Sequence, residues 1–330
     1  DIEVITKKDE EDIAWGVKNR VDYFAISFVQ NAKDMRRARA LLGDYKGKLI
    51  AKIEKFDAVS NIDEIIEVSD GIMVARGDLG IEVPYYEVPT IQKMLIRKSN
   101  AKGIPVITAT QMLLSMTQNE RATRAEISDV ANAVLDGTDI VMLSEESAIG
   151  ENPTNVVETM HNIISQTEKI YNHDKRYNFT YLDGFDVIQA TVTKLADDLS
   201  ADGILSLTSS GNSARKMSRY RPKTPLYTFA HDKETLTSLT ALWGVEPITT
   251  VKEAQASKMI QKMLRSLEKR ELLNKNGLYI CTVGYPVGIP GSTNTIKILT
   301  PSEIEFYLNF KENREKTKQE KKQKVITIDE

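Results

Sequence analysis

Short apolar runs alternate with amphipathic stretches through the first half of this 330-residue chain. The runs have the length of strands and are rich in Val and Ile, which is typical of parallel strands buried on both faces. They occupy Tyr23–Val29, Lys48–Ile53, Gly71–Ala75, Pro105–Thr110 and Asp139–Ser144. The stretches between them have helical spacing, and one helical face after Lys55 would hold Phe56, Val59, Ile62, Ile65 and Ile66. This alternation predicts an α/β fold with a parallel sheet and right-handed crossovers.

Polar side chains follow the ends of several runs, at Lys52, Glu54, Asp78, Thr110, Glu145 and Glu146. Active sites of α/β barrels lie at the carboxyl ends of the strands. A closed barrel needs eight strand–helix units, and we count about five. We therefore predict an incomplete TIM-type (β/α)8 barrel, whose remaining units lie upstream of Asp1 or come from elsewhere. Because the chain opens at Asp1 without an initiator Met, we interpret it as a truncated or processed product.

A polar and aromatic linker at about 171–185 separates this part from a second alternation. Strands are predicted at Gly203–Thr208, Leu226–Ala230, Val245–Thr250, Leu278–Val283 and Thr295–Leu299. Helices are predicted at about 186–200, from Asn212, at about 233–243, and from Lys252 to Leu273. We expect an open α/β domain here, and divide the chain into 1–172, 173–310 and a charged tail at 311–330 that is an exposed helix or solvated.

Composition narrows the class of protein. A net charge of −3 gives no sign of nucleic-acid binding, no segment is long and apolar enough for a membrane helix, and no signal peptide opens the chain. The single cysteine, Cys281, suits a reducing cytoplasm. We interpret Trp15 and Trp243 as packing residues, and the three histidines lack metal-ligand spacing.

The candidate chemical centre begins with Lys52 and Glu54, which are two residues apart on one strand and so point to the same side. Asp78 lies just beyond the next strand, between Gly77 and Gly80. Two converging carboxylates with open coordination positions suit Mg²⁺, and a nearby lysine suits phosphoryl transfer. The alternative is a pair of structural carboxylates satisfied by Lys52 and Arg76.

The segment 49–84 contains Ala-Lys-Ile-Glu-Lys, then Met-Val-Ala-Arg-Gly-Asp-Leu-Gly, and ends in Ile-Glu-Val-Pro. It closely resembles the signature of the pyruvate kinase family. Three further segments match that family in order, at 108–113, 123–134 and 291–295. The resemblance covers about residues 1 to 300.

The resemblance implies phosphoryl transfer from phosphoenolpyruvate to ADP in glycolysis, giving pyruvate and ATP, in a cytoplasmic homotetramer that uses Mg²⁺ (or Mn²⁺) and usually K⁺. It implies that Lys52 contacts the transferring phosphoryl group and that Glu54 and Asp78 hold the divalent metal. The backbone of Gly77 and Asp78 would bind the carboxylate region of the substrate. Thr110 would also touch the substrate, close to the proton relay.

Departures and absences qualify this resemblance. The chain reads Ser144-Glu145-Glu146-Ser147 where the family more often has Ser-Gly-Glu-Thr, and Gln30 and Ala122 also differ from common family residues. The K⁺ ligands, a phosphate-binding arginine and most ADP contacts of the family lie upstream of this start. If the chain is the whole molecule, we expect no turnover.

A turn in the second half resembles the phosphate loop of the family's allosteric site. It consists of Thr208, Ser209, Ser210, Gly211, Asn212 and Ser213, and links a strand to a helix start, where backbone N–H groups favour anions. Ordinary N-capping by Ser210 or Asn212 is the alternative. The effector would be a sugar phosphate or a nucleotide, and residues 284–291 would close over it.

Two rival functions remain open at this point. One is a Mg²⁺-dependent barrel lyase acting on phosphoenolpyruvate or pyruvate, which needs neither Lys52 nor the anion turn. The other is a non-catalytic fragment that binds an effector or a partner subunit. The count of only five strand–helix units supports this second reading.

Overall fold

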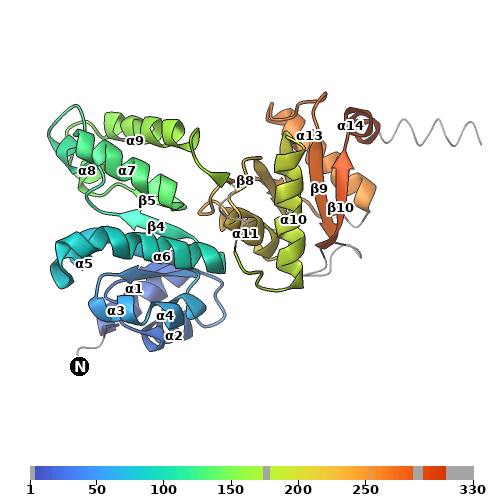
Figure 1. The fold of residues 1–330 in the computed structure, drawn as a ribbon. Helices are drawn as coiled ribbons and strands as arrows, with labels where there is room; N and C mark the ends of the chain where they lie inside the picture. The colour runs from blue at the N-terminus through green and yellow to red at the C-terminus, as the bar shows by residue number, and fades with distance from the viewer. Residues whose placement is uncertain (1–3, 174–178, 254, 285–292, 310–330) are drawn as a thin grey trace, which may run out of the picture. The chain divides into compact units, whose positions relative to one another are not determined.

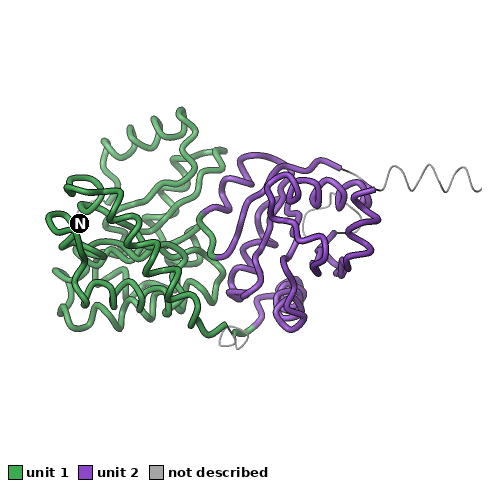
Figure 2. Tube along the Cα trace, turned by 90° about the horizontal axis from the view of Figure 1, so that it is seen from above, with its two compact units in different colours: residues 1–180, 241–243 green, residues 181–240, 244–330 purple. Residues whose placement is uncertain are grey.

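The computed structural model describes residues 4–173, 179–253, 255–284 and 293–309. The chain forms two compact units (Figure 2). Unit 1 consists of residues 1–180 and 241–243, and unit 2 of residues 181–240 and 244–330. The charged tail at 311–330 and the greater part of the predicted closing loop, 285–291, lie outside the described residues.

Unit 1 is built on a parallel sheet with the strand order β1-β2-β3-β4-β5, of which β4 and β5 are labelled in Figure 1. The strands are β1 (Tyr23–Ile26), β2 (Lys48–Ile53), β3 (Gly71–Ala75), β4 (Val106–Ala109) and β5 (Ile140–Met142). Within the described residues β1 and β5 do not pair, so the sheet is not closed. The predicted five-unit incomplete barrel is thereby confirmed.

Helices follow the strands of unit 1 in sequence. They are α1 (Lys7–Lys18), α2 (Ala32–Leu42), α3 (Phe56–Ser60), α4 (Ile62–Val68), α5 (Arg76–Glu82), α6 (Val88–Lys102), α7 (Arg124–Asp136), α8 (Glu145–Ala148) and α9 (Pro153–Glu168). Several begin where the sequence supplies a cap: Thr6 and Asp9 form a capping box at α1, and Thr123 and Glu126 form one at α7.

The two faces of this sheet have different partners. Leu49, Ala51 and Ile53 of β2 belong to the main apolar core, which also contains buried residues of α2, α4 and α6. Ile50 lies on the opposite face with Met73 and Ala109. Because side chains alternate along a strand, Lys52 shares the face of Ile50 and points away from the helical core.

Three details of the sequence prediction are wrong. The stretch after Lys55 forms two helices, because Asn61 ends α3 and its side chain donates to the carbonyl of Gln30 at 3.0 Å. Phe56 is therefore 56% exposed and does not share the buried face of Ile62. Trp15 is 65% exposed and is not a packing residue.

Unit 2 contains a second five-stranded sheet with the order β10-β9-β6-β7-β8. Its strands are β6 (Gly203–Thr208), β7 (Leu226–Ala230), β8 (Val245–Thr250), β9 (Tyr279–Gly284) and β10 (Thr293–Leu299). All neighbours are parallel except β10, which runs antiparallel to β9. The predicted open α/β architecture is confirmed.

The helices of unit 2 are α10 (Gly184–Asp198), α11 (Asn212–Arg219), α12 (Lys233–Thr237), α13 (Ala256–Lys269) and α14 (Pro301–Leu308). Two are shorter than predicted: α12 ends at Thr237, and α13 begins at Ala256. No helix in the described part of the chain has both the length and the apolarity needed to span a membrane.

Candidate active site

The carboxyl end of β2 carries the first two predicted site residues. Glu54 directly follows the strand and is 1% exposed. Lys52 Nζ lies 2.8 Å from Glu54 Oε1 and donates to Ser27 Oγ at 3.0 Å. Within the described residues, Oε1 has no partner besides this ammonium, with which it forms an ion pair. The structure thus brings the predicted pair together and leaves one buried carboxylate oxygen with unused lone pairs.

The turn after β1 holds the other oxygen of this carboxylate. The backbone N–H of Phe28 donates to Glu54 Oε2 at 2.7 Å. Phe28 has a φ of +57°, which is uncommon for a residue other than glycine. Ser27 and Phe28 therefore contact the predicted pair, and sequence reasoning missed them because it placed both within the strand Tyr23–Val29, whereas β1 ends at Ile26.

Asp78 is the third residue of α5, which begins immediately after β3. Its carboxylate is exposed and makes no hydrogen bond or ion pair with the described part of the chain. Arg76 does not serve as its partner, since the guanidinium pairs with Asp129 at 2.6 Å. Lys52 thus pairs with Glu54, as both readings of that pair require, whereas Arg76 does not pair with Asp78.

Thr110 follows β4 and adopts a left-handed backbone conformation, with a φ of +68°. Gln111 does the same, with a φ of +55°. Left-handed backbone in residues other than glycine is strained and is often found at functional sites. The Thr110 hydroxyl donates to the carbonyl of Ala109 at 2.7 Å and accepts from the N–H of Gly77 at 2.8 Å. Thr110 and Gly77 thus meet directly, and the hydroxyl proton points to the protein backbone.

Arg76 and Glu146 surround the Thr110 turn without having been predicted as site residues. Arg76 Nη2 donates to the carbonyl of Thr110 at 2.7 Å. Glu146 is 1% exposed and accepts from the N–H groups of Leu113 at 3.0 Å and Ser144 at 2.8 Å. Glu145, the residue that departs from the family pattern, is exposed at the start of α8.

The residues present fit a divalent cation. Glu54 Oε1 is a buried carboxylate oxygen without a hydrogen-bond donor, and Asp78 offers an exposed carboxylate at the end of the neighbouring strand. Mg²⁺ is usually bound through one or two carboxylates and completes its shell with water and substrate oxygens. No cluster of three or more His, Cys, Asp or Glu side chains suited to a metal occurs among the described residues.

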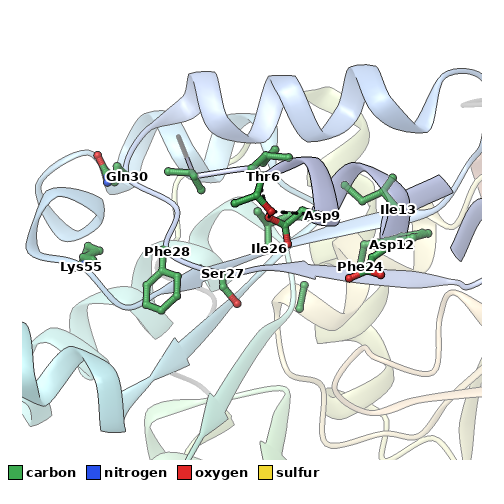
Figure 3. A pocket seen from close by; sticks show the side chains of 13 residues that line it. Thr6, Asp9, Asp12, Ile13, Phe24, Ile26, Ser27, Phe28, Gln30 and Lys55 are labelled. Atoms are coloured by element: carbon green, nitrogen blue, oxygen red, sulfur yellow. Dashed lines mark hydrogen bonds between the residues drawn. The ribbon is translucent and has the colours of Figure 1, made fainter. Parts of the chain in front are cut away.

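A pocket of about 790 Å³ lies between α1 and β1 (Figure 3). Its lining includes side chains from both faces of β1, among them Phe24, Ala25, Ile26 and Ser27. The pocket therefore runs along the edge of the strand, on the side where no described strand pairs with it. Ser27 and Phe28 line this pocket and also contact Lys52 and Glu54, and Lys55, the residue after Glu54, lines it too. We place the chemistry at the strand ends and not in the pocket.

In unit 2, the turn after β6 has the predicted strand–turn–helix arrangement. Gly211 caps α11 with a φ of +81°, and its N–H donates to Thr208 Oγ1 at 2.9 Å. Arg215 Nη2 donates to the carbonyl of Ser210 at 2.8 Å. Neither Ser210 nor Asn212 caps α11 with its side chain, so the N-capping alternative is not what the structure has.

Comparisons with known proteins show the family of the chain. The chain matches the family described as "Pyruvate kinase, barrel domain" over residues 1–157 and that described as "Pyruvate kinase, alpha/beta domain" over residues 186–299. It is 43% identical over 303 residues to a pyruvate kinase of Lactobacillus delbrueckii subsp. bulgaricus, covering 89% of this chain and 51% of the relative. It is 42% identical over 301 residues to a pyruvate kinase of Clostridium acetobutylicum, covering 89% of this chain and 64% of the relative.

A pyruvate kinase of Geobacillus stearothermophilus is 42% identical over 307 residues, which cover 91% of this chain and 52% of the relative. The matched part thus spans about half to two thirds of these relatives. Both family matches follow the order of the two sheets along the chain, and the first contains every residue of the candidate active site. The chain therefore belongs to the pyruvate kinase family.

Proposed function

We propose that unit 1 carries the metal and phosphoryl half of a site that transfers phosphate from phosphoenolpyruvate to ADP. The observation that carries the proposal is the buried Glu54 carboxylate, whose Oε1 lies 2.8 Å from the ammonium of Lys52 and has no other partner within the described residues. A cation and a metal-binding carboxylate at one strand end are what phosphoryl transfer needs, because its catalysis depends on positioning and charge stabilisation.

Each residue has a proposed role. Lys52 contacts the transferring phosphoryl group and stabilises its charge, while Glu54 and Asp78 hold Mg²⁺ or Mn²⁺. When bound there, the divalent cation would neutralise charge on substrate oxygens. Thr110 and the backbone of Gly77 and Asp78 contact the substrate. Since the Gly77 N–H already donates to Thr110, a ligand that uses this N–H has to exchange with the hydroxyl.

Metal binding tests the carboxylate assignment with the 330-residue chain. Mn²⁺ titration followed by electron paramagnetic resonance, with oxalate present, is expected to show a site that Glu54→Gln and Asp78→Asn each weaken. Removing a residue that hydrogen-bonds to a metal ligand already lowers metal affinity about 10–100-fold, so removing a ligand itself should lower it at least as much. Glu67→Gln, on the exposed side of α4, is the matched control. Equal affinity in all four proteins would overturn the assignment.

The reaction class is tested by adding phosphoenolpyruvate, with and without ADP, to a full-length version of the protein that also carries the upstream part of the family's site, because we expect no turnover from the 330-residue chain alone. Pyruvate formation that requires ADP supports the transferase. Consumption that is independent of ADP would favour the barrel lyase instead. Binding of a sugar phosphate by a chain that binds no Mn²⁺–oxalate would favour the effector-binding fragment.

We further propose that residues 173–310 regulate the catalytic part at 1–172. The turn from Thr208 to Ser213 would bind the phosphate of a sugar-phosphate or nucleotide effector, because Gly211 starts α11 with a left-handed backbone directly after β6. We also propose that the protein uses K⁺, forms a homotetramer and is cytoplasmic. Calorimetric titration with a sugar bisphosphate, compared with Ser209→Asp in the turn, tests the effector site, and analytical ultracentrifugation tests the tetramer.

A further inference from the structure

The backbone turn that carries Thr110 is held from two sides by side chains of other strand ends. Thr110 and Gln111 both have positive φ values, and Thr is β-branched, so the turn would relax without external support. The hydroxyl of Thr110 depends on this conformation for its contact with the Gly77 N–H. Whatever fixes the turn therefore also fixes that contact.

Arg76 supports the turn from the β3 side. Its Nε and Nη2 donate to the carbonyls of Ala109 at 3.3 Å and Thr110 at 2.7 Å. Its Nη1 is anchored by Asp129 of α7 and Gln92 of α6. The guanidinium is a planar fork, so two carbonyls that flank a strained residue are held at a fixed separation.

Glu146 supports the turn from the β5 side. One carboxylate oxygen accepts from the N–H of Leu113, and the other accepts from the N–H of Ser144. The two acceptors of a single buried carboxylate thereby tie the loop after β4 to the loop after β5. Hydrogen bonds of a buried ionised acceptor are stronger than those between neutral groups.

We propose that Glu146 and Arg76 are positioning residues that together hold Thr110 in its left-handed conformation and so keep its hydroxyl on the Gly77 N–H. Neither side chain needs to touch a ligand. This inference deepens the proposed function, since Thr110 and Gly77 belong to the proposed substrate site. It also predicts the behaviour of the chain without any ligand.

The test is residue-resolved amide hydrogen exchange of the deuterated 330-residue chain by NMR, without ligand. In Glu146→Gln one of the two acceptor oxygens becomes an NH₂ donor, so at least one of the amides of Leu113 and Ser144 exchanges faster. The decisive amide is Gly77, which Glu146 does not contact, and its exchange is expected to rise about tenfold. Glu151→Gln, an exposed substitution of the same chemistry, should leave Gly77 unchanged.

Unchanged exchange at Gly77 alongside faster exchange at Leu113 or Ser144 would overturn the proposal. If Glu146→Gln does not fold, Glu146→Asp keeps the buried charge and should change Gly77 exchange in the same direction by less. Arg76→Lys, with the exposed Arg36→Lys as its control, examines the other side of the turn and should also accelerate Gly77.

A ligand measurement separates this inference from the proposed function. If the unsubstituted chain binds Mn²⁺–oxalate, Glu146→Gln is expected to weaken that binding about tenfold, and full affinity in the variant would overturn the link from the turn to the ligand. If the unsubstituted chain binds no Mn²⁺–oxalate, the proposed function fails, while the exchange at Gly77 still decides whether Glu146 positions Thr110.

Discussion

Replacing Asp186 with alanine should destabilise unit 2 strongly. Asp186 lies on α10 and is 0% exposed, and its Oδ2 accepts from Arg219 of α11, from the Tyr220 hydroxyl at 2.9 Å and from the N–H of Leu182 at 2.9 Å. Arg219 is 1% exposed. Removing one partner of a buried ion pair costs about 3–5 kcal/mol, because the other charge stays out of water.

Urea denaturation followed by circular dichroism gives the overall loss in unfolding free energy. Both tryptophans, Trp15 and Trp243, belong to unit 1, so tryptophan fluorescence follows that unit, whereas hydrogen exchange of α10 and α11 follows unit 2. The matched control is Asp198→Ala, which removes an exposed pair with Lys194 and should cost about 0.5 kcal/mol or less.

A second variant distinguishes a lost charge partner from lost packing. Asp186→Leu combined with Arg219→Met replaces both charges with apolar side chains, and this should recover part of the stability, since the buried unpaired charge is gone while the Tyr220 hydroxyl and the Leu182 N–H still lose Asp186 as an acceptor. The reasoning would be refuted by a cost below about 1 kcal/mol for Asp186→Ala, or by a double variant no more stable than the single one. Since Arg219 lies on α11, the same pair anchors the helix that follows the proposed phosphate turn.

Three further predictions concern single residues. Burial raises the pKa of Cys281 to about 12, so iodoacetamide at pH 8 should modify it only after denaturation, and rapid labelling of the native chain would contradict this. Gly211→Ala should lower the free energy of unfolding, measured by urea denaturation, more than Gly244→Ala does. Both glycines have a positive φ, but only a Cβ at position 211 would clash, at 2.9 Å from Leu239. Burial opposes ionisation of Asp70, yet Arg39 and the N–H of Leu49 hold the pKa of Asp70 below its usual value. The stabilisation that the Asp70 carboxylate gives is therefore present above about pH 4 and is lost as the pH falls through the lowered pKa. The stability difference between the chain and Asp70→Asn should therefore shrink on acidification, and a difference independent of pH would contradict the assignment.

Much of the fold could be predicted because its signals are local. The apolar run Lys48–Ile53 is a strand with the predicted bounds, and so is Gly71–Ala75, since a buried parallel strand needs an unbroken apolar sequence. The capping residue Thr6 and the glycine at 103 mark helix ends in the same local way. Residue spacing also placed Lys52 beside Glu54 correctly, because side chains alternate strictly along a strand.

Other features depend on partners distant in the sequence. Asn61 breaks the helix after Lys55 by donating to Gln30, 31 residues away, and no periodicity within 56–66 reports this contact. The short α12 ends at Thr237 although the sequence favours a longer helix, and residues 241–243 join unit 1. Tertiary packing overrides propensity at such places, since a few long-range contacts outweigh small local preferences.

The sequence by itself determined which residues carry the candidate chemistry: Lys52, Glu54, Asp78 and Thr110 stand at strand ends because the order of strands and helices puts them there. Only the tertiary structure decided how they are held. In the folded chain the Phe28 N–H donates to Glu54 Oε2, and Oε1 accepts no hydrogen bond within the described residues. Arg76 and Glu146 hold the loop that carries Thr110. The physical reason is that hydrogen bonds between loops of different strands depend on backbone positions in space, which no local sequence pattern encodes.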